Sequence, residues 1–169
     1  MPRYSPRLLP PYAHLPGRTP HPTRHPRGHS YGLEVDGPAF MPADAGDHPD
    51  FRYGLDLHNH GCFWECHECL EGVWRGLPRS DPAARFLQGV IQLSVAHSYV
   101  RRGRPAVSPK LAGWALANWQ DCPSTYAACA IDALRQAVDD WLTADCHGLV
   151  VLRLLPEASG WRTEAATFW

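Results

Sequence analysis

Apolar side chains recur at helical intervals from about residue 50 onward. Between residues 61 and 77 they form a stripe with steps of three and four positions, made of Phe63, Cys66, Leu70, Val73, Trp74 and Leu77. This spacing places the apolar side chains on one face of an α-helix. The stretch is therefore predicted to be an amphipathic helix that packs this face against the rest of the domain.

The same periodicity, combined with start and stop signals, predicts four more helices, at residues 51–61, 82–103, 108–119 and 125–144. Asp81 before Pro82 and Ser108 before Pro109 are typical helix starts. Ser124 can cap the last helix, which has the longest uninterrupted pattern in the chain. The apolar run at 149–156 is too isolated to establish a sheet.

The first 48 residues differ from the rest, because eleven of the seventeen prolines lie within the first fifty positions. Proline at this density excludes a sustained helix or a central strand. We therefore expect a Pro/His/Arg-rich arm over 1–48, extended or partly disordered, a helical domain over 49–148 and a C-terminal tail over 149–169. The predicted fold class is all-α, a compact bundle of four to five helices preceded by the arm.

Charge is distributed unevenly, although the formal total is only −1. Residues 1–33 hold five arginines and no acid, and removing those five from the 16 basic residues leaves 11 against 17 acids, or −6, for the remainder. A basic arm ahead of an acidic body indicates contact with nucleic acid or a membrane, or an arm that lies on its own domain. We prefer the second, because the chain has one lysine and lacks a dedicated nucleic-acid surface.

Three histidines of the arm, His21, His25 and His29, stand four residues apart. In an extended chain this spacing does not bring three imidazoles together, so we expect no metal site built from the arm alone. Either these histidines are solvated loop residues, or the arm lies over the body and delivers His21 or His29 to a site there.

The sequence also bears on the compartment and the partners. No apolar run approaches the roughly 20 residues that span a bilayer, and the N-terminus lacks the apolar segment of a signal peptide. We expect a cytoplasmic protein without membrane contact, whose six cysteines are reduced thiols or metal ligands. The partner, a small molecule or a protein, is not specified, and a homo-oligomer is compatible with the sequence.

Three cysteines of the stretch 61–77 have a suggestive spacing. Cys62, Cys66 and Cys69 form the CxxxCxxC pattern by which radical S-adenosylmethionine enzymes hold an iron–sulfur cluster, but those enzymes carry it on a loop of a large α/β barrel. On a helix the three thiols fall within about 60° of one another, where copper(I) or zinc could bridge them. Thiols that fill the side of a packed helix are the simpler interpretation, and we expect no iron–sulfur cluster.

The same helix carries the run HECLE, which is close to the HExxH motif of zinc proteases but has Glu71 in place of the second histidine. A glutamate can still bind zinc, iron or manganese, and His67 and Glu71, four residues apart, lie on one face of the helix. On the helical wheel they border the apolar stripe beside Trp64 and Trp74. His67 and Glu71 are therefore the candidate ligands of a divalent metal in a pocket between helices.

Other polar residues can complete such a site. Glu65 and Glu68 point further round the helix and are the candidate catalytic carboxylates, Glu68 joining the metal from the rim and Glu65 orienting a ligand. His97 lies in the apolar stripe of the helix at 82–103, where a buried imidazole is either a satisfied core residue or a partner of carboxylates or a metal.

The residues from Asn59 onward resemble an uncharacterised family, the domain of unknown function 309, over roughly residues 50–120. The matching positions are Asn59, Gly61, Phe63, Trp64, Glu65, His67, Glu68, Leu70, Glu71, Trp74, Leu87, Gln88, Gly89, Ile91 and Gln92. The resemblance implies a compact all-helical fold and no established activity. It adds Asn59, Trp74 and Gln88 to the candidate site residues.

The resemblance also separates the polar residues from the thiols. The family commonly has alanine where Cys66 stands, and Cys62 and Cys69 fall at variable positions, whereas the histidine and glutamates belong to the motif. His97 lies outside the motif. The arm is similar to an N-terminal extension of some members, which favours an arm docked on the body.

Two hypotheses follow. In the first, the domain is a divalent-metal-binding protein, or a metal-dependent hydrolase or lyase, whose ion is held by His67 and Glu71 with Glu68. In the second, these residues form a structural polar network in a non-catalytic interaction module. Three tryptophans would then contribute to its core or partner surface: Trp114, Trp119 and Trp141.

Overall fold

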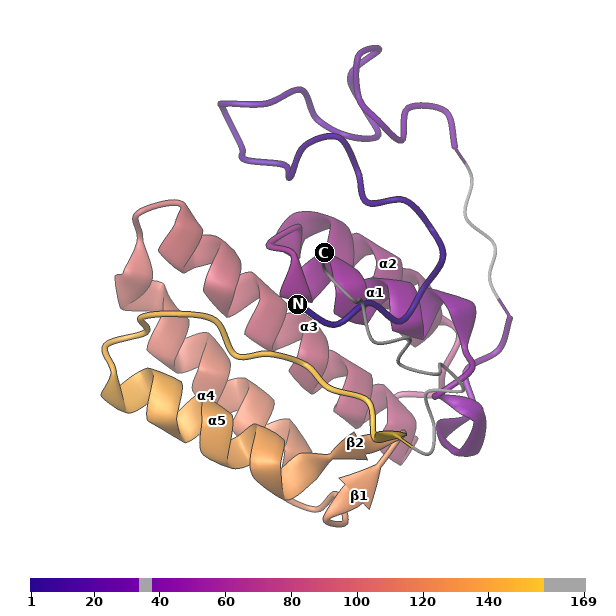
Figure 1. Cartoon of the computed structure of the whole chain (residues 1–169), viewed down its shortest axis with the longest axis vertical. Coiled ribbons are helices and arrows are strands. Elements are labelled where there is room, and N and C mark those ends of the chain that lie inside the picture. Colours follow the sequence, from indigo (N-terminus) through magenta and orange to yellow (C-terminus); the bar gives the residue numbers. More distant parts are fainter. Residues whose placement is uncertain (34–37, 157–169) are drawn as a thin grey trace, which may run out of the picture.

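The protein is described by a computed structural model over residues 1–33 and 38–156, and this part contains five α-helices, which confirms the predicted all-α bundle (Figure 1). The helices are α1 (Pro49–Asn59), α2 (Phe63–Arg75), α3 (Pro82–Arg101), α4 (Ser108–Trp119) and α5 (Ile131–Thr143). Short 3-10 turns cover Pro42–Asp44 and Pro105–Val107, and β1 (Thr125–Tyr126) pairs with β2 (Cys129–Ala130). None of the described helices combines the length and apolar character that crossing a membrane requires.

Helices α3 and α4 begin where their start signals indicated, and the five helices bury one continuous core. At the start of α3, the Asp81 carboxylate accepts the backbone N–H of Ala83 at 2.8 Å, and Pro82 occupies the first turn. The largest fully buried side chains come from all five helices and from the chain after α5; they include Phe51, Leu55, Leu70, Phe86, Leu93, Trp119, Ile131 and Leu152. The core therefore extends beyond the helices to residues after position 148.

Helices α3 and α4 approach closely at Gly89. A Cβ atom at this position would lie 2.3 Å from Nε1 of Trp119, which no side chain can tolerate. The same Nε1 donates to the Phe86 carbonyl at 3.0 Å, so the indole of α4 is held against the backbone of α3. Gly89, one of the motif residues, is thus explained by packing.

The prediction of a fifth helix starting at residue 125 was wrong for its first six residues. Ala127 and Ala128 have φ of +48° and +59°, and the pairing of Tyr126 with Cys129 makes them the two-residue turn of the β1–β2 hairpin. Alanine-rich sequence normally favours helix, but a two-residue hairpin turn with both φ angles positive fits the twist of paired strands. Helix α5 consequently begins at Ile131.

Replacing Ala128 with glycine is expected to raise the free energy of unfolding by about 0.5–1 kcal/mol. A left-handed backbone costs alanine about 1–2 kcal/mol that glycine does not pay, and the greater freedom of glycine in the unfolded chain offsets part of the gain. Urea denaturation measures the change. The matched control is Ala133→Gly on the exposed side of α5, which should lower stability by about 1 kcal/mol; a loss of stability in both variants would contradict the turn assignment.

The arm lies on the acidic body, as its charge predicted. Asp56 of α1 is fully buried and accepts the backbone N–H groups of Tyr4 and Ser5 at 2.7 and 2.8 Å, while the guanidinium of Arg3 lies 3.2 Å from the same carboxylate. A second salt bridge joins Arg7 to Asp50. In Figure 1 the arm continues from this anchor across α1 and α2.

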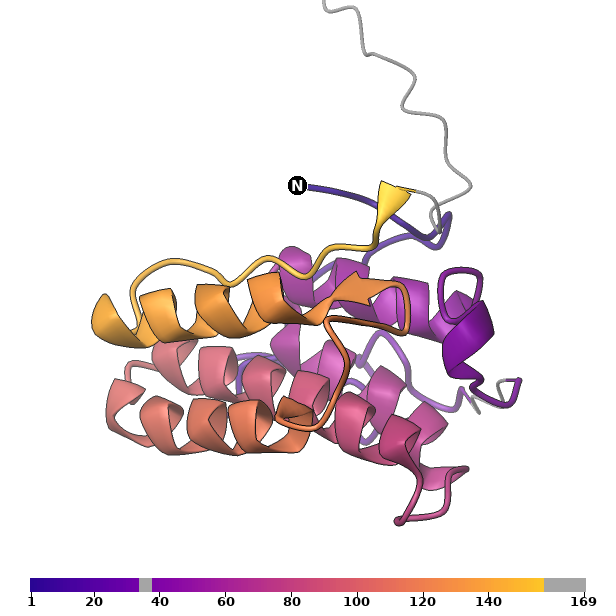
Figure 2. The same ribbon diagram turned by 90° about the horizontal axis from the view of Figure 1, so that it is seen from below.

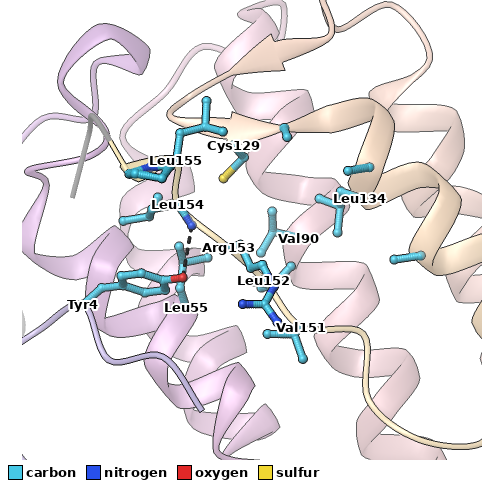
Figure 3. A pocket seen from close by; sticks show the side chains of 14 residues that line it. Tyr4, Leu55, Val90, Cys129, Leu134, Val151, Leu152, Arg153, Leu154 and Leu155 are labelled. Atoms are coloured by element: carbon cyan, nitrogen blue, oxygen red, sulfur yellow. Dashed lines mark hydrogen bonds between the residues drawn. The ribbon is translucent and has the colours of Figure 1, made fainter. Parts of the chain in front are cut away.

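The segment from 149 to 155 forms one isolated β-bridge, between Leu154 and Cys129, and is otherwise held by side chains. Val150, Leu152 and Leu154 are buried in the core. The backbone of Val150 is bound by His58 and His97, and that of Leu152 by Asn59. The N–H of Leu154 donates to the hydroxyl of Tyr4. Figure 3 shows the Tyr4–Leu154 hydrogen bond at the edge of an apolar cavity of about 430 Å³, between this segment, α1, α3 and α5. The segment runs back along α5 (Figure 2) and completes the core.

Candidate metal site

Two adjacent turns of α2 bring one imidazole and two carboxylates together. Ligand atoms of His67, Glu68 and Glu71 all lie within 4.8 Å of one another. Nδ1 of His67 is 3.2 Å from Glu68 Oε1, and its Nε2 is 3.9 Å from Glu71 Oε2. The sequence placed His67 and Glu71 on one face because they stand four residues apart, with Glu68 joining them from the rim, and the structure brings the ligand atoms of all three together.

His67 and Glu71, but not Glu68, line a pocket between α2, α3 and α4. Its volume is about 250 Å³, and its lining consists of His67, Glu71, Trp74, Gln88, Ile91, Gln92, Val95, Leu111 and Trp114. The walls are mostly apolar, and the polar groups gather at the α2 side and at the two glutamines of α3. Gln92 accepts a hydrogen bond from Asn118 of α4 at 2.9 Å, which fixes its amide.

Trp74 adds a hydrogen-bond donor to this pocket. Its indole Nε1 is inaccessible to solvent and has no partner among the described residues. A buried N–H without an acceptor costs about 1–3 kcal/mol, so a movement of the ring that brought Nε1 to an oxygen of a bound ligand would be stabilised. The ring is held on its other side by the Arg79 guanidinium, 4.9 Å from the ring centre.

The charges around the cluster partly balance. The hydrogen bond from His67 lowers the pKa of Glu68, against the opposing effect of its partial burial. Arg75 lies 2.9 Å from Glu71 and competes with any cation for that carboxylate. All three cluster side chains are accessible, with 30%, 42% and 24% of the side-chain surface exposed for His67, Glu68 and Glu71. An ion can therefore reach them from solvent.

Glu65, predicted to assist catalysis, lies under the arm and does not line the pocket. Its Oε1 accepts the backbone N–H of His14 at 2.7 Å and contacts Nε2 of His29 at 3.1 Å, while its buried Oε2 has no partner among the described residues. The side chain is directed away from the pocket because it stands about 200° round the helix from His67. Its observed contacts are those of an anchor for the arm.

The other arm histidine among the candidates, His21, is packed against Trp64. Its ring lies 5.1 Å from Trp64 and 5.1 Å from His14, and its charge contributes to the lowered pKa of Glu68. His21 is thus beside the rim of the cluster, whereas His29 is engaged by Glu65. His14, which the spacing argument passed over, is 7% exposed and takes part in the arm's docking.

His97 and Asn59 lie away from the pocket, in the core beneath the C-terminal segment. The Nε2 atom of His97 accepts the Val150 N–H, and its ring centre lies 4.2 Å from Trp141 and 5.1 Å from His58. Asn59 binds both backbone groups of Leu152. His58 was not singled out from the sequence, because it follows no ligand spacing.

The thiols of Cys66 and Cys69 in α2, and of Cys62 just before it, are all shielded from solvent to different extents. Burial raises the pKa of Cys62 to about 11 and that of Cys69 to about 12, and it raises that of Cys66 further above the ordinary range. Cys66 contacts the Ser94 hydroxyl, and Cys69 donates to the Asp50 carbonyl at 3.4 Å. These are the surroundings of packed, protonated thiols, and they favour the packing interpretation.

The fold and the site together define an all-helical domain with a His/Glu cluster on its second helix. Residues 51–111 match the model of the family described as Domain of unknown function (DUF309), in agreement with the resemblance that the motif residues carry. The match includes every residue that lines the pocket except Trp114. No curated protein matches the chain.

Proposed function

We propose that the domain binds a divalent cation through His67, Glu68 and Glu71 and uses it on a small molecule held in the adjacent pocket. The observation that carries the proposal is the convergence of the three ligand groups beside a partly apolar pocket that two of them, His67 and Glu71, line. One imidazole and two carboxylates suit zinc, iron or manganese, and three protein ligands leave coordination positions for water and substrate.

The chemistry supported by this arrangement is a hydrolytic or lyase step. A bound divalent ion supplies a Lewis acid and lowers the pKa of its water toward neutrality. Ile91, Val95 and Leu111 would hold the apolar part of the substrate, and the unpartnered Trp74 N–H would bind one of its oxygens. Glu68, the most exposed side chain of the cluster, is placed to exchange a proton with solvent.

The alternative is a structural polar network in a non-catalytic interaction module. The salt bridge between Arg75 and Glu71 and the contact between His67 and Glu68 favour it. Solvent-accessible pairs of this kind contribute only about 0–1 kcal/mol each, so stability alone explains little of the cluster. This is why we place the metal-binding function first.

Metal analysis of protein purified without a histidine tag tests the proposal. We expect a stoichiometric divalent metal that is lost in His67→Ala and in Glu71→Gln, with affinity weakened at least about tenfold. Cys62→Ala and Cys69→Ala should retain it, as should the matched surface controls His147→Ala and Asp139→Ala. Metal that survives the first two substitutions, or that depends on the cysteines, would place the ion elsewhere. Metal-free protein that takes up none of the three ions on titration would support the structural alternative.

A further inference from the structure

The end of α3 and the docked arm enclose a second pocket of opposite character. Its volume is about 190 Å³, and its lining consists of Leu15, Pro16, Arg18, Arg101, Arg102 and Arg104. Four of the six residues are arginines, and none is acidic. The pocket exists only where the arm lies against the body, because Arg18 comes from the arm and the other three from the end of α3.

These four arginines lack the acidic partners that other arginines of the chain have. Arg3, Arg7, Arg52, Arg75, Arg85 and Arg135 each form a salt bridge with an aspartate or glutamate. Within residues 1–33 and 38–156 no carboxylate pairs with any of the pocket's guanidinium groups. Four like charges around one hollow repel each other, and an anion in the hollow would relieve that repulsion.

Hydrogen bonds at the end of α3 fix the backbone from which three of the arginine side chains extend. The N–H of Arg104 donates to the Tyr99 carbonyl and that of Gly103 to the Val100 carbonyl, both at 2.9 Å, and Gly103 has φ of +72°. This is the Schellman pattern that ends a helix and turns the chain back. The guanidiniums of Arg102 and Arg104 both lie over the Tyr99 ring, 5.2 and 5.9 Å from its centre.

The opposite wall is fixed by a turn of the arm. The side chain of Thr19 accepts the Leu15 N–H at 2.9 Å, and the Arg18 N–H donates to the Leu15 carbonyl at 2.9 Å. His14, the residue before this turn, is bound to Glu65 of α2. The arm's anchor on α2 therefore also positions Arg18.

We propose that this pocket binds the phosphate groups of a small phosphorylated molecule, such as a diphosphate. Guanidinium groups match phosphate oxygens through paired N–H donors. The C-terminal end of a helix carries a partial charge of about −0.5 that would repel an anion, but the positive charge of four arginines is larger. The size of the pocket suits a phosphate headgroup, since complete small-molecule sites occupy about 300–1,000 Å³. A nucleic acid is disfavoured, because the chain outside residues 1–33 carries a net −6 and a long polyanion would meet its carboxylates.

Calorimetric titration of the full chain with inorganic pyrophosphate in the presence of a metal chelator tests this site. The chelator makes the result independent of the proposed metal function. We expect binding by the unmodified protein and roughly tenfold or weaker affinity in the triple variant Arg18→Gln/Arg102→Gln/Arg104→Gln. The triple variant Arg24→Gln/Arg27→Gln/Arg153→Gln removes the same charge from exposed positions elsewhere and should bind as the unmodified protein does. The replaced residues are exposed in both variants, so both should fold with ordinary helical circular dichroism.

Three results would overturn the proposal. The first is no detectable binding of pyrophosphate by the unmodified protein. The second is an equal loss of affinity in both triple variants, which would indicate general charge attraction. The third is that a short DNA duplex binds more tightly than pyrophosphate and that its binding requires the same three arginines. The pocket would then be a nucleic-acid site.

Discussion

Replacing Asn59 with alanine is expected to lower the free energy of unfolding by about 2–4 kcal/mol. The amide of Asn59 is 2% exposed, accepts the Leu152 N–H at 2.9 Å and donates to the Leu152 carbonyl at 2.8 Å. Alanine would leave both backbone groups buried without a partner, and each such group costs about 1–3 kcal/mol. The loss should appear as a shifted urea midpoint.

A second asparagine distinguishes the specific role of Asn59 from the general effect of removing an asparagine side chain. Asn118→Ala is the matched control, since its side chain is half-buried and its partners, Gln92 and the Trp114 carbonyl, are near the surface. That variant should lose less than about 1 kcal/mol. Equal losses for the two substitutions would show that the C-terminal segment is not held as the structure describes.

Lowering the pH from 7 to 4 is expected to destabilise the protein by on the order of 5 kcal/mol through two buried histidines. Burial lowers the pKa of His58 to about 4, against a smaller opposing effect of its hydrogen bond to the Val150 carbonyl. Burial, together with the neighbouring His58, lowers the pKa of His97 to about 2. At pH 4 each of these lowered pKa values reduces the free energy of unfolding by about 2–3 kcal/mol relative to pH 7.

The direction follows from which state binds protons. Between pH 6.5 and 4 both imidazoles are protonated in the unfolded chain and largely neutral in the folded protein, so unfolding takes up protons and stability falls as the pH falls. Above pH 6.5 both states are neutral at these residues and the contribution is constant. Near pH 4 folded His58 begins to bind its own proton, and the slope decreases.

Denaturant unfolding at a series of pH values measures this dependence. His97→Gln keeps a polar group near the Val150 N–H and removes one titrating residue, so its curve should be flatter between pH 6.5 and 4 even if its stability at pH 7 is lower. His147→Gln, at an exposed position, should follow the unmodified curve. An unchanged slope in His97→Gln would argue against a buried neutral imidazole at that position.

Periodicity and start signals were sufficient to predict the helices, because each amphipathic stripe reports the face that is buried. They failed at residues 125–130, where two alanines adopt a left-handed turn that local propensity opposes. The C-terminal segment could not be foreseen either. Apart from a backbone bridge to Cys129, its partners are side chains of α1, of α3 and of the arm, and nothing in a short apolar run specifies such partners.

The candidate site was predictable to the extent that it lies on one helix. Four-residue spacing brought His67 and Glu71 together, and the helical wheel correctly placed them beside the apolar stripe. Glu65 is also a glutamate of α2, but it faces the arm. The path of the arm depends on hydrogen bonds from its backbone N–H groups to Asp56 and Glu65, and such bonds have no sequence signature. His97 and Asn59 look like site residues because buried polar groups serve structure and chemistry alike.

The most direct measurement of the central claim is the anomalous scattering of crystals grown with Mn²⁺ or Zn²⁺. A metal bound as proposed would give a peak on α2 at about 2.0–2.3 Å from a ring nitrogen of His67 and from carboxylate oxygens of Glu68 and Glu71, with Arg75 displaced from Glu71. The coordination positions of the metal that the protein leaves free should face the pocket that Trp74 and Gln88 line. Saturating metal that gives no peak at this cluster, while His67 and Glu71 keep the contacts described above, would contradict the account.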